Sequence, residues 1–171
     1  MRRTSQLPAV TTLLLALFLT TFGCKSNISP DPVVLTSLQG NWKITDITID
    51  PAFVYRGVGI TNLTSALPLL GETCLTDAVV TFNANGTIAN NLATQASCTN
   101  APFTKQIVNA FFGPTTTYSE TANQATLTTG GQTVTGSKVF TATTATFVAK
   151  LPTDPSGAAV ATTYTVVLTK R

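Results

Sequence analysis

Apolar and polar residues alternate on both sides of the Asn85 and Gly86 pair. Val80 and Phe82 precede this pair, and Ile88 follows it at the same even spacing. Because residues two apart on a strand share a face, the pattern predicts a β-hairpin with one buried face. Phe82 and Ile88 are equidistant from Asn85, which predicts an odd-length loop: a type I turn and bulge with Gly86 in the left-handed conformation.

The first apolar segment, residues 38–50, changes its pattern once. Trp42 and Ile44 occupy even positions, whereas Ile47 and Ile49 occupy odd ones. One extra residue between Ile44 and Ile47, a β-bulge, restores the alternation and bends the strand. Long, bent first strands of this kind are typical of closed barrels.

Beyond residue 115 the chain reads as short strands separated by turn signals. Leu127 and Val134 are equidistant from residues 130–131, both glycine, which predicts a two-residue hairpin turn. Further turns are expected at residues 143–144 and 152–157, and a last alternating strand follows. This spacing predicts an all-β fold, an antiparallel up-and-down barrel of about eight strands with one short helix or lid loop.

Two segments interrupt the strand pattern. Residues 53–71 contain Pro68 and are predicted to form a loop with at most a helical turn. This loop is either an apolar lid or a lip that touches lipid, or it simply caps the core. Residues 104–112 place four apolar residues on one helical face, with Thr104 as N-cap, although their Val and Phe content also suits a strand.

Residues 1–23 have the features of an export signal. Arg2 and Arg3 precede an apolar run, residues 13–19, that is shorter than the about 20 residues of a membrane-spanning helix. Gly23 followed by Cys24 resembles the lipobox of bacterial lipoproteins, which implies a diacylglycerol thioether on Cys24, cleavage before it and acylation of the new amino terminus, typically with palmitate. The alternative is an ordinary secretory signal with an incidental cysteine.

Residues 24–35 are expected to form an extended tether. Pro30 and Pro32 disfavour a helix, and an extended chain here spans some 30 Å or more at about 3.1 Å per residue. Lys25 after the cysteine resembles signals that permit outer-membrane delivery, on either face of that membrane. Residues 36–171 then form a single domain, which we expect to be monomeric.

The charge balance excludes one class of partner. The chain has ten Lys and Arg residues, of which Arg2 and Arg3 belong to the predicted signal, so eight face seven Asp and Glu residues afterwards. This near-neutral remainder has no basic cluster that could follow a phosphate backbone, and nucleic-acid binding is not expected.

Cys74 and Cys98 remain once Cys24 is assigned to lipid. Exported proteins in an oxidising compartment normally pair such cysteines, so a disulfide is expected. The loop of about 25 residues that it closes corresponds to roughly 3.5 kcal/mol in chain-entropy terms. Two free buried thiols are the alternative.

The sequence offers little catalytic chemistry. It contains no histidine, which excludes a Ser-His triad and histidine-ligated zinc. The carboxylates have no pair at a recognisable spacing, which leaves open a pair formed in space, such as Asp46 with Glu120. No glycine-rich phosphate loop precedes a helix. We therefore expect no enzyme activity, no metal and no cofactor.

Several motifs resemble one protein family. Gly40 and Trp42 look like the Gly-x-Trp that opens the first strand of lipocalins, and residues 74–87 are similar to the cysteine, aspartate and hairpin motif of lipocalin-like lipoproteins common in Bacteroidota. The chain also ends in a similar strand, residues 164–170. The resemblance implies a lipocalin-like barrel in which Trp42 plugs the closed end and Lys170 covers the indole.

Two functions follow from these expectations. The first is a lipid-anchored envelope barrel that binds a small apolar ligand in its interior, lined by Phe82, Phe140, Phe147 and Tyr164. The alternative is a structural or interaction lipoprotein in which the same side chains fill the barrel and the outer surface docks to an envelope partner. An enclosed cavity of a few hundred cubic ångströms would favour the first, and a solid core the second.

Overall fold

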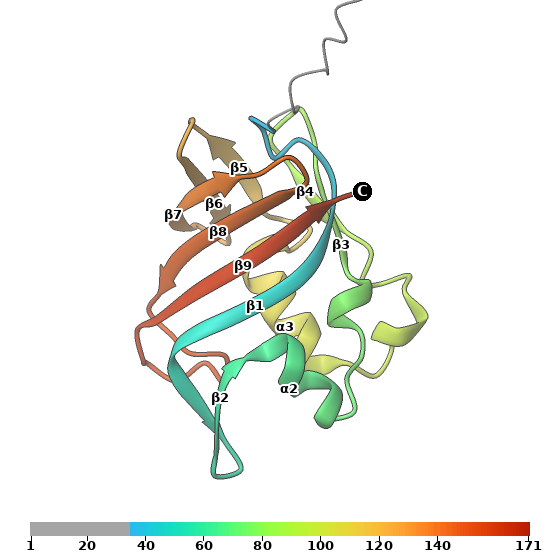
Figure 1. Cartoon of the computed structure of the whole chain (residues 1–171), viewed down its shortest axis with the longest axis vertical. Helices are drawn as coiled ribbons and strands as arrows, with labels where there is room; N and C mark the ends of the chain where they lie inside the picture. The colour runs from blue at the N-terminus through green and yellow to red at the C-terminus, as the bar shows by residue number, and fades with distance from the viewer. Residues whose placement is uncertain (1–34) are drawn as a thin grey trace, which may run out of the picture. The chain divides into compact units, whose positions relative to one another are not determined.

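Nine antiparallel strands form one sheet in the computed structural model, which describes residues 35–171 (Figure 1). The strands are β1 (Gly40–Tyr55), β2 (Val58–Asn62), β3 (Val79–Phe82), β4 (Ile88–Asn90), β5 (Thr117–Glu120), β6 (Gln124–Thr129), β7 (Gln132–Phe140), β8 (Thr144–Leu151) and β9 (Thr162–Lys170). Two α-helices, α2 (Leu63–Leu69) and α3 (Pro102–Phe112), and two 3₁₀ turns, η1 (Leu75–Asp77) and η2 (Ala96–Cys98), lie between strands.

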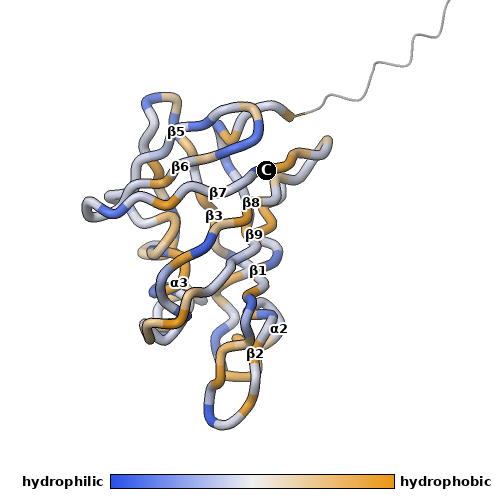
Figure 2. Tube along the Cα trace, turned by 90° about the vertical axis from the view of Figure 1, so that its left-hand side faces the viewer, coloured by the Kyte–Doolittle hydropathy of each residue, from blue (hydrophilic) through white to orange (hydrophobic). Residues whose placement is uncertain are grey.

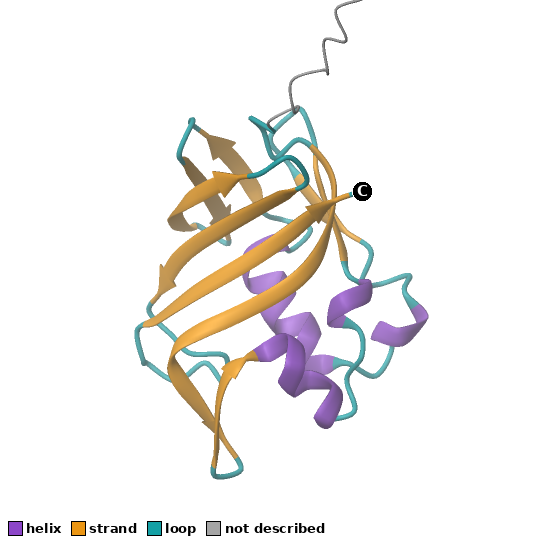
Figure 3. Ribbon diagram, in the orientation of Figure 1, coloured by secondary structure: helices purple, strands orange, loops and turns teal. Residues whose placement is uncertain are grey.

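Eight of these strands form a nearly closed ring. Their order is β4-β3-β1-β9-β8-β7-β6-β5, and β2 pairs with β1 outside this path. The two ends of the path meet where Thr87 bridges Thr117 and where the Ile88 N–H donates to the Thr116 carbonyl at 3.0 Å. The predicted all-β antiparallel barrel is confirmed (Figure 3).

Strand β1 holds the barrel together because it serves three partners. Its first residues pair with β3, its last residues pair with β2, and most of its length pairs with β9. The register with β9 shifts between Ile44 and Asp46, so the predicted bulge is confirmed. Ile44 and Ile47 both point into the core, although residues three positions apart on a regular strand would face opposite sides.

The two predicted glycine turns are also confirmed. Phe82 pairs with Ile88, and Gly86 has the positive φ of 80° that this loop requires. Leu127 pairs with Val134 across a turn in which both glycines have positive φ.

The turn between β7 and β8 lies one residue earlier than predicted. The Thr141 N–H donates to the Thr144 carbonyl at 2.9 Å, so the turn residues are Ala142 and Thr143. The Thr141 hydroxyl accepts from the N–H groups of Thr143 and Thr144, which stabilises this turn over its neighbour in sequence.

Residues 53–71 are not the predicted loop. Strand β1 continues through Tyr55 and pairs with β2, and α2 follows directly. The Asn62 side chain caps α2 by accepting from the Ser65 N–H at 2.8 Å. Pro68 removes one intrahelical hydrogen-bond donor, and the helix ends one residue later, at Leu69.

The predicted helix near residues 104–112 is confirmed as α3, but Thr104 is not its N-cap. The helix begins at Pro102, and the Glu72 carboxylate accepts from the N–H groups of Phe103 and Thr104 at 3.1 and 2.7 Å. A carboxylate from a distant segment thus occupies the positive end of the helix dipole. Local sequence does not reveal such a partner.

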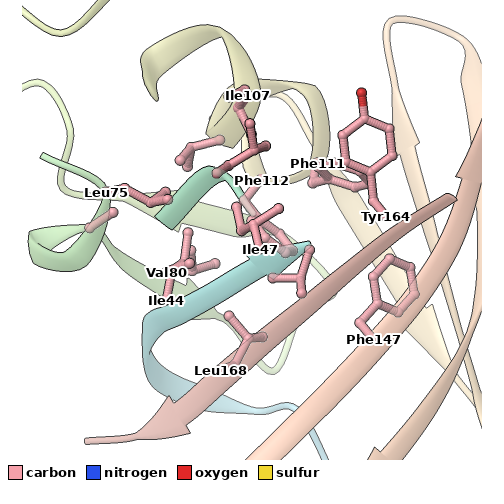
Figure 4. Close-up of a cluster of buried hydrophobic side chains, with 14 of the residues drawn as sticks. Ile44, Ile47, Leu75, Val80, Ile107, Phe111, Phe112, Phe147, Tyr164 and Leu168 are labelled. Carbon is pink, nitrogen blue, oxygen red and sulfur yellow. The ribbon is translucent and has the colours of Figure 1, made fainter. Parts of the chain in front are cut away.

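The hydrophobic core runs from Leu38 to Leu168, so the described residues have a core of their own. Helix α3 contributes its buried face to this core (Figure 4), and the Phe111 and Tyr164 rings meet with centroids 5.1 Å apart. Among residues 35–171, no helix has the length and apolar character needed to cross a membrane. The predicted signal, Cys24 and residues 24–34 of the tether lie outside the described residues.

Candidate functional site at the two ends of the barrel

Strand β9 connects the two ends of the barrel. It begins at Thr162, which pairs with Leu151, and finishes at Lys170, which pairs with Trp42. We call the end at Trp42 the closed end and the end at Leu151 the mouth.

The closed end is built around the Trp42 indole. The ring is fully buried, its Nε1–H donates to the Leu38 carbonyl, and the Lys170 ammonium lies 4.5 Å from the ring centroid. Lys170 also donates to the Gln39 carbonyl. A Cβ on Gly40 would stand only 2.7 Å from the Lys170 Nζ, so glycine at that position leaves room for the cation. The structure therefore brings together the two residues that the family resemblance singled out.

A buried ion pair fastens the first described residues to the closed end. The Lys138 ammonium, fully buried, contacts the Glu120 carboxylate, which also accepts from the Ser37 hydroxyl at 2.6 Å and the Leu38 N–H at 3.2 Å. Burial acts to raise the pKa of Glu120, but the hydrogen bonds from Lys138, Ser37 and Leu38 outweigh it and lower that pKa. Glu120 is therefore ionised at neutral pH.

The Cys74–Cys98 disulfide is confirmed. The two Cα atoms are 4.7 Å apart, and both cysteines are fully buried. The bridge joins η1 to η2, and Ser97 reinforces the junction by donating its hydroxyl to Asp77 at 2.7 Å. Because α3 begins soon after Cys98, the bridge also sets the position of that helix.

The four residues expected to line a ligand cavity lie in two places. Phe82, Phe147 and Tyr164 are buried inside the barrel, whereas Phe140 is at the closed end, 6.3 Å from the Trp42 ring. Inside the barrel the aromatic side chains pack against one another or against α3. Phe82 meets Phe112 and Tyr118, Tyr164 meets Phe111, and Phe147 lies against Gly136.

A cleft of about 320 Å³ opens at the mouth between α3, the β6–β7 hairpin and the end of β8. Its wall is apolar, and its rim carries hydroxyl and amide groups. The wall contains Phe111, Leu127, Val134, Leu151 and Pro152, and the rim contains Thr129, Gln132 and Thr153. A smaller hollow of about 90 Å³ shares Phe111 and Leu151 with this cleft and extends it towards Tyr164 and Asp154.

Two titratable groups border this extension. Burial, followed by the charge of Asp154, raises the pKa of Tyr164 to about 12, so its hydroxyl stays protonated and donates to the Thr153 carbonyl at 3.4 Å. Burial acts to raise the pKa of Asp154, but hydrogen bonds from Ser156 and Ala158 lower it. At neutral pH the extension therefore has one neutral phenol and one negative charge.

A family model described as a lipocalin-like domain matches residues 38–149. This chain belongs to the lipocalin-like family. The match begins beside the closed-end tryptophan and runs into β8, so it covers most of the barrel. Comparisons with curated proteins and with solved structures found no match.

The lipocalin-like family is generally non-enzymatic. Among residues 35–171, no group of three or more His, Cys, Asp and Glu residues is placed to hold a metal ion. Asp46 accepts from Asn62 at 2.9 Å, and Glu120 is paired with Lys138, so these two carboxylates do not form an acid–base pair.

Sequence reasoning missed two features of this lipocalin-like domain. The first is the ion pair, whose signal was a lysine at the inward-facing position 138 of β7, between Gly136 and Phe140. The second is the cleft, because the spacing of Leu127 and Val134 predicts a turn but does not show that both side chains line a cleft. Their position beside α3 depends on tertiary packing.

Proposed function

We propose that this lipocalin-like domain is a non-catalytic binding module that holds a small apolar ligand in the cleft at the barrel mouth. The supporting observation is the cleft itself, with its apolar wall and a volume of about 320 Å³. Sites for small molecules have volumes of about 300–1,000 Å³ and combine apolar walls with a few polar groups. The cleft fits the lower end of this range.

The mouth is a better site than the barrel interior. Helix α3 inserts Phe111 and Phe112 among the inward side chains of the strands, as Figure 4 shows. Of the four residues expected to contact a ligand, Tyr164 borders the cleft's extension, and Phe82 and Phe147 support the core. We therefore propose the mouth, and not the interior, as the location of the ligand site.

We further propose that Cys24 carries a lipid anchor in the outer membrane. The described chain starts at Leu35, which lines a hollow at the closed end together with Phe140. A tether that leads back from Leu35 to Cys24 would attach the barrel by the end opposite the mouth. The Cys24→Ala variant should leave unprocessed precursor or release the protein from membranes, because stable anchoring needs more than one acyl chain. Unchanged membrane attachment would contradict the anchor.

Docking to an envelope partner is the second candidate, and the exposed tip of the β1–β2 hairpin favours it. Val54, Val58 and Leu69 have exposed fractions of 67, 64 and 87%. Val58 of β2 and Leu69 of α2 line a hollow of about 230 Å³, together with the Tyr55 ring and the Arg56 guanidinium that covers it at 5.3 Å. Figure 2 shows hydrophobic segments along the hairpin that contains β2.

A pair of variants on adjacent residues of β7 tests the binding function. Val134 points into the cleft and Thr135 points to solvent, so Val134→Trp should fill the cleft while Thr135→Trp leaves it open. We expect residues 25–171 to bind a neutral naphthylamine dye, seen as increased dye fluorescence. Native mass spectrometry of the same preparations should detect any ligand that co-purifies.

The dye and any ligand should be lost only in Val134→Trp. Equal dye binding by the two variants would remove the cleft as the site. A wild-type protein that binds no dye and carries no ligand would favour the docking function.

A further inference from the structure

The cleft and its extension are unusual in their charge. Of the side chains that line them, Asp154 alone is ionised at neutral pH, and none is a lysine or arginine. Lys150 is close in sequence to Leu151, but it is exposed and alternates with the inward residues of β8. A ligand in the cleft therefore meets no positive charge and approaches one negative charge.

The apolar wall of the cleft is formed by side chains that carry no hydrogen-bond donor. At its borders the Thr129 hydroxyl shares a hydrogen bond with the Thr116 hydroxyl, and the Tyr164 hydroxyl donates to the Thr153 carbonyl. Across residues 35–171, no buried side-chain nitrogen or oxygen lacks a hydrogen-bond partner. An anionic group placed there would lose its hydration without gaining donors, and burial of an unpaired charge is strongly unfavourable.

The rim offers hydrogen bonds of another kind. Gln132 is exposed at the β6–β7 turn, and Gln106 donates its amide to the Pro155 carbonyl, which leaves the amide oxygen as an acceptor. A terminal hydroxyl or amide of a ligand can bond to such neutral groups while its apolar body lies against Phe111 and Leu127. A neutral amide can donate a hydrogen bond to a carboxylate, but it does not supply the positive charge that would balance one.

We infer that the cleft selects an uncharged, mainly aliphatic molecule with one terminal hydroxyl or amide, and that it rejects ligands with a carboxylate or phosphate head group. This inference rests on the proposed binding function, because it names the ligand class of the same cleft. Free fatty acids and anionic phospholipids would therefore be poor ligands, and fatty alcohols or similar neutral lipids would be good ones.

A matched pair of ligands tests the inference. Decan-1-ol and decanoate have the same chain length and differ in the head group, and decanoate is fully ionised at pH 8. Calorimetric titration of residues 25–171 should give a Kd for decanol at least about tenfold lower than that for decanoate. Equal affinity, or tighter binding of decanoate, would overturn the inference.

A matched pair of variants tests its physical cause. Gln132→Lys places a cation on the rim of the cleft, whereas Thr133→Lys adds the same charge to the opposite, outward face of the β6–β7 hairpin. An exposed ion pair contributes up to about 1 kcal/mol, so Gln132→Lys should tighten decanoate binding by up to about fivefold. Decanol binding should not change in either variant, and a gain of decanoate binding in Thr133→Lys alone would contradict the assignment.

Failure of the inference is distinguishable from failure of the proposed function. If wild-type protein binds decanoate as well as decanol, and Val134→Trp abolishes both, the cleft is a binding site without the proposed selectivity. If neither ligand binds and the naphthylamine dye is also excluded, both the binding function and the selectivity are wrong.

Discussion

The closed end and the mouth of this barrel are built on different principles. At the closed end, charged groups have specific partners: the partly exposed Lys170 covers the Trp42 ring, and the buried Lys138 contacts the partly buried Glu120. At the mouth, apolar side chains such as Leu151 and Val134 remain partly exposed around a cleft. Polar groups at the closed end thus join segments of the chain to one another, whereas the mouth leaves apolar surface exposed.

This difference predicts that substitutions at the two ends affect different properties of the protein. A buried charge that has lost its partner is costly, so changes at the closed end should lower stability. Changes at the mouth remove fewer contacts and should alter binding first.

The closed end should be most sensitive at Trp42. Replacing a fully buried large aromatic by alanine costs about 3–5 kcal/mol, so Trp42→Ala should lower the free energy of unfolding by that amount. Lys170→Ala removes the cation over the ring and its hydrogen bond to the Gln39 carbonyl, but it leaves the ring in place and should cost less, about 0.5–2 kcal/mol. Urea unfolding followed by circular dichroism measures both, because Trp42 is the single tryptophan. A Trp42→Ala variant as stable as wild type would refute the plug.

The disulfide should have the next largest effect. Cys74→Ser should lower stability by roughly 3.5 kcal/mol or less, because the unfolded chain gains entropy when the loop is opened. Since the bridge positions α3, proteolysis should cut near residues 99–101 before the Trp42 emission changes. Thiol labelling of the native protein should find both cysteines unreactive until a reductant is added. An early red shift of Trp42 emission would show that the two ends are not independent.

The ion pair should make the closed end sensitive to acid. The pKa of Glu120 is lower in the folded chain than its ordinary value of 4.5, so folding favours the ionised carboxylate. Its contribution is complete above pH 4.5 and is lost as the pH falls through the lower, folded pKa. At pH 7, Glu120→Gln should cost about 1.5–3 kcal/mol, the range for a hydrogen bond to a charged group.

Urea unfolding between pH 3 and pH 7 measures this contribution. The wild type should lose more stability than Glu120→Gln across the acid part of the range. Asp154→Asn, which changes a carboxylate at the mouth, is the matched control. Parallel curves for wild type and Glu120→Gln would contradict the role of the ion pair.

The exposed apolar surface around Val58 and Leu69 should have the smallest effect on stability. Leu69 has an exposed fraction of 87%, so Leu69→Ser should change the free energy of unfolding by no more than about 0.5 kcal/mol. Binding of the naphthylamine dye should also be unchanged, because Leu69 lies outside the cleft. A loss of dye binding in Leu69→Ser would show that the dye binds in the hollow lined by Leu69 and not at the mouth.

Features that depend on neighbours along the chain could be predicted from the amino-acid sequence. The turns at Gly86 and at residues 130–131 follow from positive φ, and the bulge after Ile44 follows from a change in parity. The pairing of Cys74 with Cys98 was predictable because few cysteines remained to choose from. Alternation also identified the inward residues of β9, since a strand has only two faces.

Tertiary structure decided what occupies the space that those inward faces enclose. Alternation assigned Phe82 and Tyr164 to the interior, but it did not show that α3 would place Phe111 and Phe112 between them. The same is true of Glu72 at the start of α3 and of Glu120 beside Lys138, because both contacts join segments that are distant in sequence. Alternation along a strand shows which side chains point inward, but it does not show whether other side chains fill the space that they enclose. Only the folded barrel therefore distinguishes a packed interior from a cleft at its mouth.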